Sequence, residues 1–252
     1  MIRVKIENSA SGDYRSDEAM KELRTNVLFS GSENKVIAFS SCYPNEGKST
    51  VALNFALSMA QDGKKVLFID ADLRKSVIVG RYKLARDYKG LSHFLSGMST
   101  FDEVIYGVEN SSLHVVFAGP VPPNPAELLG NKYFETLIKQ LRNVYDYVII
   151  DTPPMEAVVD ALIIARKCDS VVLVTSVAST SYKIVNNVKE SFERNQIKIL
   201  GIVLNKVPID KKGYGYYKYG KYGRYSRYGG YGKYGKYEKY APYGDAADVI
   251  EK

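Results

Sequence analysis

Residues 38–56 carry a pattern that could bind phosphate. The segment reads AFSSCYPNEGKSTVALNFA, in which an apolar run leads into the letters GKST (residues 47–50) and then into an amphipathic helical pattern. In such a loop the backbone N–H groups point at phosphate oxygens, the lysine bridges the β- and γ-phosphates, and the serine hydroxyl ligates Mg²⁺. Cys42 stands where the strict G-x-x-x-x-G-K-[ST] pattern has its first glycine, so an ordinary loop is the alternative for this segment alone. The nucleotide-contacting residues predicted from this loop are Pro44, Asn45, Glu46, Gly47, Lys48, Ser49 and Thr50.

Three carboxylates stand at the ends of two further apolar runs. Residues 66–74 read VLFIDADLR, with Asp70 and Asp72 at the end of the run, and residues 147–154 read YVIIDTPP, with Asp151. Ligands of open α/β sheets bind outside the carboxyl ends of the strands, so we expect all three acids beside the phosphate loop. Asp151 can hold Mg²⁺. Of Asp70 and Asp72, which share a face if the chain stays extended, one can join the metal while the other accepts a hydroxyl proton. The alternative for each acid alone is a helix cap or a surface charge.

The residues around these motifs alternate between strand and helix patterns. Unbroken apolar runs such as VVLVTS and YVIID are typical of strands buried on both faces, and helical spacing of apolar residues follows most of them. This alternation predicts an α/β fold with a doubly wound, mostly parallel sheet. Together with the phosphate loop, such a sheet resembles the P-loop NTPases of the MinD/ParA type. The predicted strands are 36–40, 66–70, 113–117, 147–151, 171–176 and 199–205. The predicted helices are 16–29, 49–61, 125–141, 157–167 and 181–194.

Three regions differ in composition. We predict a flexible leader over residues 1–15, a P-loop domain over 16–210 and a low-complexity tail over 211–252. From Tyr219 to Tyr243 a tyrosine falls at every third position, with Lys, Arg and Gly filling most of the others. The tail has few aliphatic residues with which to build a core, so we expect it to be disordered. It holds 10 Lys/Arg and 4 Asp/Glu, and therefore carries +6 of the formal charge of +7.

Cysteine usage and hydropathy suit a cytosolic protein. The only two cysteines are far apart in the sequence and form no metal-ligand or disulfide pattern. No apolar run reaches the roughly 18–20 residues of a transmembrane helix. We expect a cytoplasmic chain that reaches the inner face of the membrane through a partner.

The three motifs together resemble the bacterial tyrosine kinases, known as BY-kinases. The resemblance rests on SSCYPNEGKST, VLFIDADLR and YVIIDTPP, and continues in GPVPPNPAELL (119–129), GIVLNKV (201–207) and the terminal tyrosine cluster. It is strongest to the cytosolic kinases of Gram-positive capsule and exopolysaccharide operons. The resemblance implies that the chain is an ATP- and Mg²⁺-dependent protein-tyrosine kinase whose domain occupies residues 16–210.

The family pattern also implies roles for single residues. Asp70 matches the acid that engages the acceptor tyrosine, and Asn205 resembles a residue near the adenine. Glu18, Lys21 and Arg24 fall on the spacing of an E-x-x-R-x-x-R motif that assembles kinase rings, with Lys21 in place of the first arginine. The predicted catalytic residues are Lys48, Asp70 and Asp72, and the predicted metal ligands are Ser49, Asp72 and Asp151.

The predicted phosphoacceptors lie in the chain itself. Autophosphorylation is expected on the tail, with family resemblance favouring transfer in trans within a homo-oligomer. The resemblance further implies a membrane-embedded activator of the polysaccharide co-polymerase type, a tyrosine phosphatase, other protein substrates and control of polysaccharide synthesis and export. The predicted acceptor residues are Tyr214, Tyr216, Tyr217, Tyr219, Tyr222, Tyr225, Tyr228, Tyr231, Tyr234, Tyr237, Tyr240 and Tyr243.

Two other readings of the sequence are open. A partition or division-site ATPase shares the sheet and the loop, but its K-G-G-x-G-K-T pattern has lysine where this chain has Tyr43. A nucleotide-sensing module could instead use the basic, aromatic tail to bind nucleic acid or anionic lipid. The three-acid site argues against that reading, and no nucleic-acid partner is expected.

Overall fold

The computed structural model describes residues 1–6, 14–81, 88–177 and 180–208. The predicted tail, 211–252, lies outside the described residues, and so do all of its candidate acceptor tyrosines. Among the residues that are described, no helix has the length and apolar content needed to cross a bilayer.

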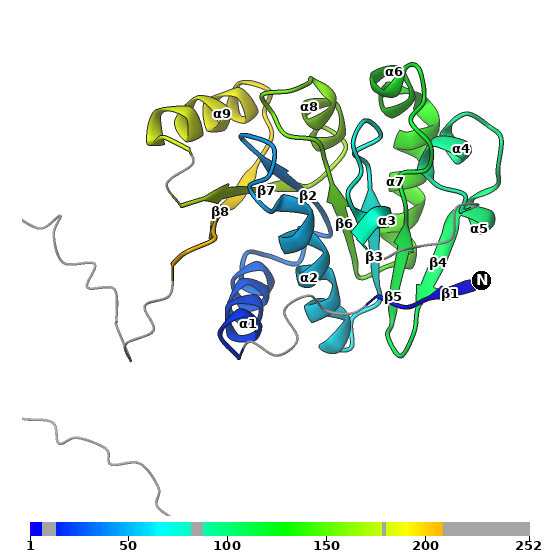
Figure 1. Cartoon of the computed structure of the whole chain (residues 1–252), viewed down its shortest axis with the longest axis horizontal. Coiled ribbons are helices and arrows are strands. Elements are labelled where there is room, and N and C mark those ends of the chain that lie inside the picture. Colours follow the sequence, from blue (N-terminus) through cyan, green and yellow to red (C-terminus); the bar gives the residue numbers. More distant parts are fainter. Residues whose placement is uncertain (7–13, 82–87, 178–179, 209–252) are drawn as a thin grey trace, which may run out of the picture. The chain divides into compact units, whose positions relative to one another are not determined.

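A single sheet of eight strands organises residues 1–208 (Figure 1). Its spatial order is β1-β4-β5-β3-β6-β2-β7-β8, and every neighbouring pair is parallel except β4 with β5. The central strands are buried on both faces, which explains their continuous apolar sequences. The strands are β1 (Ile2–Val4), β2 (Val36–Ser41), β3 (Val66–Asp70), β4 (Ile105–Val108), β5 (Leu113–Val116), β6 (Tyr147–Asp151), β7 (Ser170–Ser176) and β8 (Ile199–Asn205).

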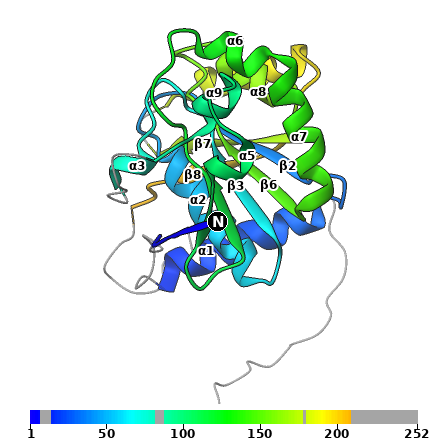
Figure 2. The same ribbon diagram turned by 90° about the vertical axis from the view of Figure 1, so that its right-hand side faces the viewer.

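Helices cover both faces of this sheet (Figures 1 and 2). On one face, α1 (Tyr14–Phe29) and α2 (Lys48–Gln61) pack on the strands, with the rings of Phe39 and Phe55 5.4 Å apart. On the other face lie α7 (Lys132–Val144) and α9 (Tyr182–Arg194). The remaining helices are α3 (Ile78–Arg81), α4 (Leu91–Leu95), α5 (Phe101–Val104), α6 (Pro125–Gly130) and α8 (Asp160–Ala165).

The predicted doubly wound sheet is confirmed, and all six predicted strands are present. The flexible leader over 1–15 is wrong at Ile2–Val4, because these residues pair with β4 and form the edge strand β1. The single helix predicted over 125–141 is also wrong. Asn131 breaks it with an extended backbone, and its side chain accepts a hydrogen bond from the N–H of Phe134 at 3.0 Å, which starts α7 afresh.

Phe192 anchors α9 to the sheet. Within α9, all of whose residues are described, it alone is fully buried, and it packs in a cluster with Ala38 and Leu173. We expect Phe192→Ala to lower the free energy of unfolding by about 3 kcal/mol, since it removes a large buried side chain and leaves a cavity. Urea unfolding followed by circular dichroism measures this. Tyr182→Ala on the same helix is the control, because Tyr182 is exposed and its loss should change stability by less than about 0.5 kcal/mol.

Candidate active site

The phosphate loop joins β2 to α2 through a left-handed turn. Gly47 has a φ of 91° and Asn45 a φ of 64°, both in the left-handed region. A side chain at Gly47 would collide with Asn205, since an added Cβ would lie 2.1 Å from its Nδ2. The N-cap residue of α2 is Gly47, which has no side chain with which to cap the helix. The N-terminus of this 14-residue helix, beside a left-handed turn, suits an anion such as phosphate.

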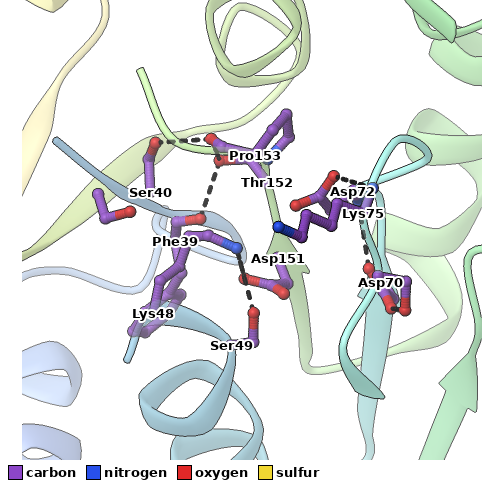
Figure 3. Close-up of polar contacts among 12 residues, drawn as sticks. Phe39, Ser40, Lys48, Ser49, Asp70, Asp72, Lys75, Asp151, Thr152 and Pro153 are labelled. Atoms are coloured by element: carbon purple, nitrogen blue, oxygen red, sulfur yellow. Dashed lines mark hydrogen bonds and ion pairs between the residues drawn. The ribbon is translucent and has the colours of Figure 1, made fainter. Parts of the chain in front are cut away.

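Lys48 forms a buried ion pair with Asp151 beneath the loop. The Lys48 Nζ lies 2.8 Å from the Asp151 Oδ1 and 3.1 Å from the Ser49 Oγ (Figure 3). Burial raises the pKa of Asp151, and the positive charge of Lys48 opposes that rise. The contact brings together residues 103 positions apart, as their places at the edge of one parallel sheet predict.

Asp70 lies next to Asp151 across the sheet. The two residues are register partners on β3 and β6, and both are at most 1% exposed. The Asp70 Oδ2 accepts a hydrogen bond of 2.5 Å from the Ser76 hydroxyl. Burial raises the pKa of Asp70 to about 8, with the negative charge of Asp151 adding to the effect and the Ser76 hydrogen bond opposing it. The pair is a carboxylate cluster in which ionisation of one acid hinders ionisation of the other.

Asp72 has left the strand and lies in a turn. Its N–H donates to the Asp70 Oδ1 at 3.2 Å, and its own Oδ1 accepts from the N–H groups of Arg74 and Lys75. Because β3 ends at Asp70, the strand rule that puts alternate residues on one face no longer applies. Asp72 lines the cavity in front of the loop, whereas Asp70 and Asp151 are not among the residues that line it.

A cavity of about 420 Å³ opens in front of the phosphate loop. All seven loop residues predicted to contact nucleotide line it, together with Pro153 and Pro154. Four cations also reach it, which suits a polyphosphate. Three of these were given no role from the sequence: Arg74, Lys75 and Lys206. The first two lie two and three residues after Asp72 in the VLFIDADLRK segment, and this position in the sequence could have indicated them.

Two sequence-predicted sites look different in the structure. Asn205, expected near an adenine, is absent from the lining of this cavity, and its Nδ2 donates to the backbone oxygen of Glu46 at 2.9 Å. Arg24, expected in subunit contacts, donates to the backbone oxygen of Ser58 at 2.8 Å and so ties α1 to α2. Lys21 and Glu18 pair on the surface of α1 at 2.6 Å. The roles predicted for these residues remain predictions.

The oxygen donors at the site fit Mg²⁺. Ser49 and Asp72 line the cavity, and Asp151 accepts a hydrogen bond from Lys48, the residue next to Ser49. Hydroxyl and carboxylate oxygens are the ligands that this hard cation prefers. Among the residues described, no three His, Cys, Asp or Glu side chains form a metal cage on their own. Mg²⁺ commonly takes one or two carboxylates and completes its shell with water and substrate phosphates.

Comparisons with known proteins agree with this geometry. Residues 34–199 match the family described as AAA domain. Tyrosine-protein kinase CpsD of Streptococcus agalactiae is 46% identical over 218 residues, covering 86% of this chain and 95% of that protein. Tyrosine-protein kinase YwqD of Bacillus subtilis (strain 168) is 38% identical, covering 80% of this chain and 86% of that protein.

Solved structures give the same result. The kinase domain of the Escherichia coli tyrosine kinase ETK is 33% identical with a TM-score of 0.75, covering 84% of this chain and 86% of that chain. The chimerical protein CapA2B2 has the same identity and TM-score, covering 82% of this chain and 93% of that chain. MinD from Pyrococcus horikoshii OT3, at 22% identity and a TM-score of 0.58, shares the fold alone. With an ATP-type phosphate loop, a three-acid cluster and relatives of this similarity, the chain belongs to the bacterial tyrosine-protein kinases of the capsule-related P-loop group.

Proposed function

We propose that this kinase transfers the γ-phosphoryl group of ATP to the tyrosines of its own tail. The observation that carries the proposal is the convergence of Lys48, Asp70, Asp72 and Asp151 beside the uncapped end of α2. Phosphoryl transfer asks a protein chiefly for positioning and charge stabilisation, and this arrangement supplies both. The loop amides and Lys48 would bind the phosphates, while Asp70 would orient the acceptor hydroxyl and take its proton.

Mg²⁺ would be held by Ser49, Asp72 and Asp151 together with phosphate oxygens. When bound, the ion neutralises charge on those oxygens. The relation of the acids to the loop supports this assignment, since Asp72 reaches the cavity and Asp151 contacts the lysine of the loop.

The substrate side of the proposal rests on the tail composition. Twelve of the 21 tyrosines lie between Tyr214 and Tyr243, separated largely by Gly and Lys or Arg. One solved structure that resembles this chain is the chimerical protein CapA2B2, and one similar protein is the putative tyrosine-protein kinase CapB of Staphylococcus aureus. We infer that the chain acts as a homo-oligomer at the inner face of the membrane, activated by a membrane-embedded partner and reversed by a phosphatase, and that it regulates polysaccharide synthesis and export.

Lys48→Met tests the phosphate site. The substitution removes the cation that would contact the phosphates and leaves Asp151 without its ion-pair partner. We expect a loss of phosphotyrosine formation of at least about 100-fold, as for removal of a key electrostatic group. Mass spectrometry of the chain after incubation with Mg·ATP and activator measures it. Lys183→Met on exposed α9 is the matched control. ATP hydrolysis without any phosphotyrosine in the wild type would favour the partition-type ATPase instead.

Asp70→Asn tests the proton acceptor. The carboxylate form of Asp70 is the minority species below its raised pKa of about 8, so the wild-type rate should rise about tenfold per pH unit between pH 6 and 7 and level off above 8. Asp70→Asn should lower the rate by about 100-fold or more and remove this rise. Single-turnover phosphorylation across the pH range gives both quantities. A variant that keeps the wild-type rate and profile would show that another group accepts the proton.

Mixing a chain without an active site with a chain without acceptor tyrosines distinguishes transfer in trans from transfer in cis. One chain carries Lys48→Met and an intact tail; the other has phenylalanine at the twelve tail tyrosines and an intact site. We expect phosphate to appear on the Lys48→Met chain, at a rate that rises with the concentration of the other chain. Phosphate on neither chain, with the wild type active, would mean that each site reaches only its own tail.

A further inference from the structure

Glu46 is a buried carboxylate of the phosphate loop, and its side chain is hydrogen-bonded to the protein. It is only 2% exposed, although it is among the residues that line the cavity. Four donors surround it. Its Oε1 accepts from the Thr175 hydroxyl at 2.9 Å, the Ser176 N–H at 3.2 Å and the Thr180 hydroxyl at 2.5 Å, and its Oε2 accepts from the Tyr43 N–H at 2.8 Å.

These contacts leave Glu46 little capacity to bind a ligand. Each carboxylate oxygen accepts a backbone N–H, which can only donate, so both oxygens act as acceptors. Hydrogen bonds to a charged acceptor are among the stronger ones in proteins, and a buried carboxylate needs them. Two of the donors belong to the end of β7, and Thr180 lies just before α9. Glu46 therefore fastens the loop to the neighbouring strand.

A second set of contacts holds the same loop from β8. The Asn205 Nδ2 donates to the Glu46 backbone oxygen at 2.9 Å and lies directly over Gly47, while the Lys206 Nζ donates to the Asn45 backbone oxygen at 2.6 Å. Both bonds use loop carbonyls. Because a peptide unit is planar, a hydrogen bond that holds its carbonyl also fixes the direction of its N–H group.

We propose that Glu46 is a positioning residue, and that with Thr175, Thr180 and Asn205 it forms a loop clamp that fixes the phosphate-binding amides before nucleotide arrives. The clamp deepens the proposed function and rests on it. It explains why a carboxylate stands in a loop that binds a polyanion. Its negative charge opposes nucleotide binding by Coulomb repulsion, and the order that it imposes on the loop outweighs that repulsion.

Glu46→Gln separates the positioning effect from the charge repulsion, because the two effects change the affinity for Mg·ATP in opposite directions. The amide has nearly the shape of the acid, but its NH₂ group faces either the Tyr43 N–H or the three other donors, so at least one hydrogen bond is lost. If positioning dominates, the affinity for Mg·ATP should fall about tenfold or more. If charge repulsion dominates, removal of the negative charge should tighten binding. Fluorescence titration of the full chain with a labelled Mg·ATP analogue measures the affinity.

Further readouts distinguish positioning from general damage and from metal ligation. In Glu46→Gln the affinity for adenosine, which lacks phosphates, should change much less than the affinity for Mg·ATP. The Mg²⁺ concentration that gives half-maximal activity at saturating ATP should stay within about twofold of the wild-type value. The milder Thr175→Val removes one donor at nearly constant shape. It should weaken Mg·ATP by severalfold, with a double-variant loss smaller than the product of the single losses.

Glu135→Gln on α7 is the matched control, since it makes the same change of charge at an exposed Glu–Lys pair. It should leave nucleotide affinity unchanged. Unchanged or tighter Mg·ATP binding by Glu46→Gln, an equal loss for adenosine, or a changed Mg²⁺ requirement alone would each overturn the clamp. A wild-type chain that fails to bind Mg·ATP would overturn the proposed function, and the clamp with it.

Discussion

The buried contact between Lys48 and Asp151 is the constraint on which the site depends. It links the first residue of α2 to the last residue of β6, at 2.8 Å and almost without solvent. Removing two charges from water costs several kcal/mol, so such a pair adds little net stability while remaining costly to break on one side. Its value is geometric, because the pair sets where Lys48 and the Asp151 carboxylate lie relative to each other.

The packing of the sheet holds two carboxylates close together although their negative charges repel each other. Asp70 and Asp151 sit side by side on adjacent parallel strands, buried under helices on both faces. The surrounding strands are apolar and continuously packed, so the sheet cannot relax to separate the two acids. The consequence is a raised pKa at Asp70, which would suit the proposed role of this residue as a proton acceptor near neutral pH.

Both backbone conformation and polar side chains fix the shape of the phosphate loop. Positive φ angles at Asn45 and Gly47 direct the amides, and polar side chains from β7 and β8 hold the carbonyls and the Glu46 carboxylate. The loop is therefore hydrogen-bonded to three separate segments: the end of β7, Thr180 before α9, and the end of β8. Preorganised N–H groups need no reorganisation when charge develops on phosphate oxygens, which is the general source of electrostatic catalysis in phosphoryl transfer.

The sequence alone determined the parallel sheet, the phosphate loop and the acids at strand ends, because long buried strands and GKST-type loops have strong local patterns. The short strands β1 and β4 were not predicted from the sequence, since three or four residues carry too little periodicity. β1 forms a strand by pairing with β4, and β4 also pairs with β5. Only the tertiary structure decided that Asn205 holds the loop and that Arg24 is engaged by α2. These contacts join residues 34 to 159 positions apart, and a side chain's direction at that range depends on packing that no local pattern encodes.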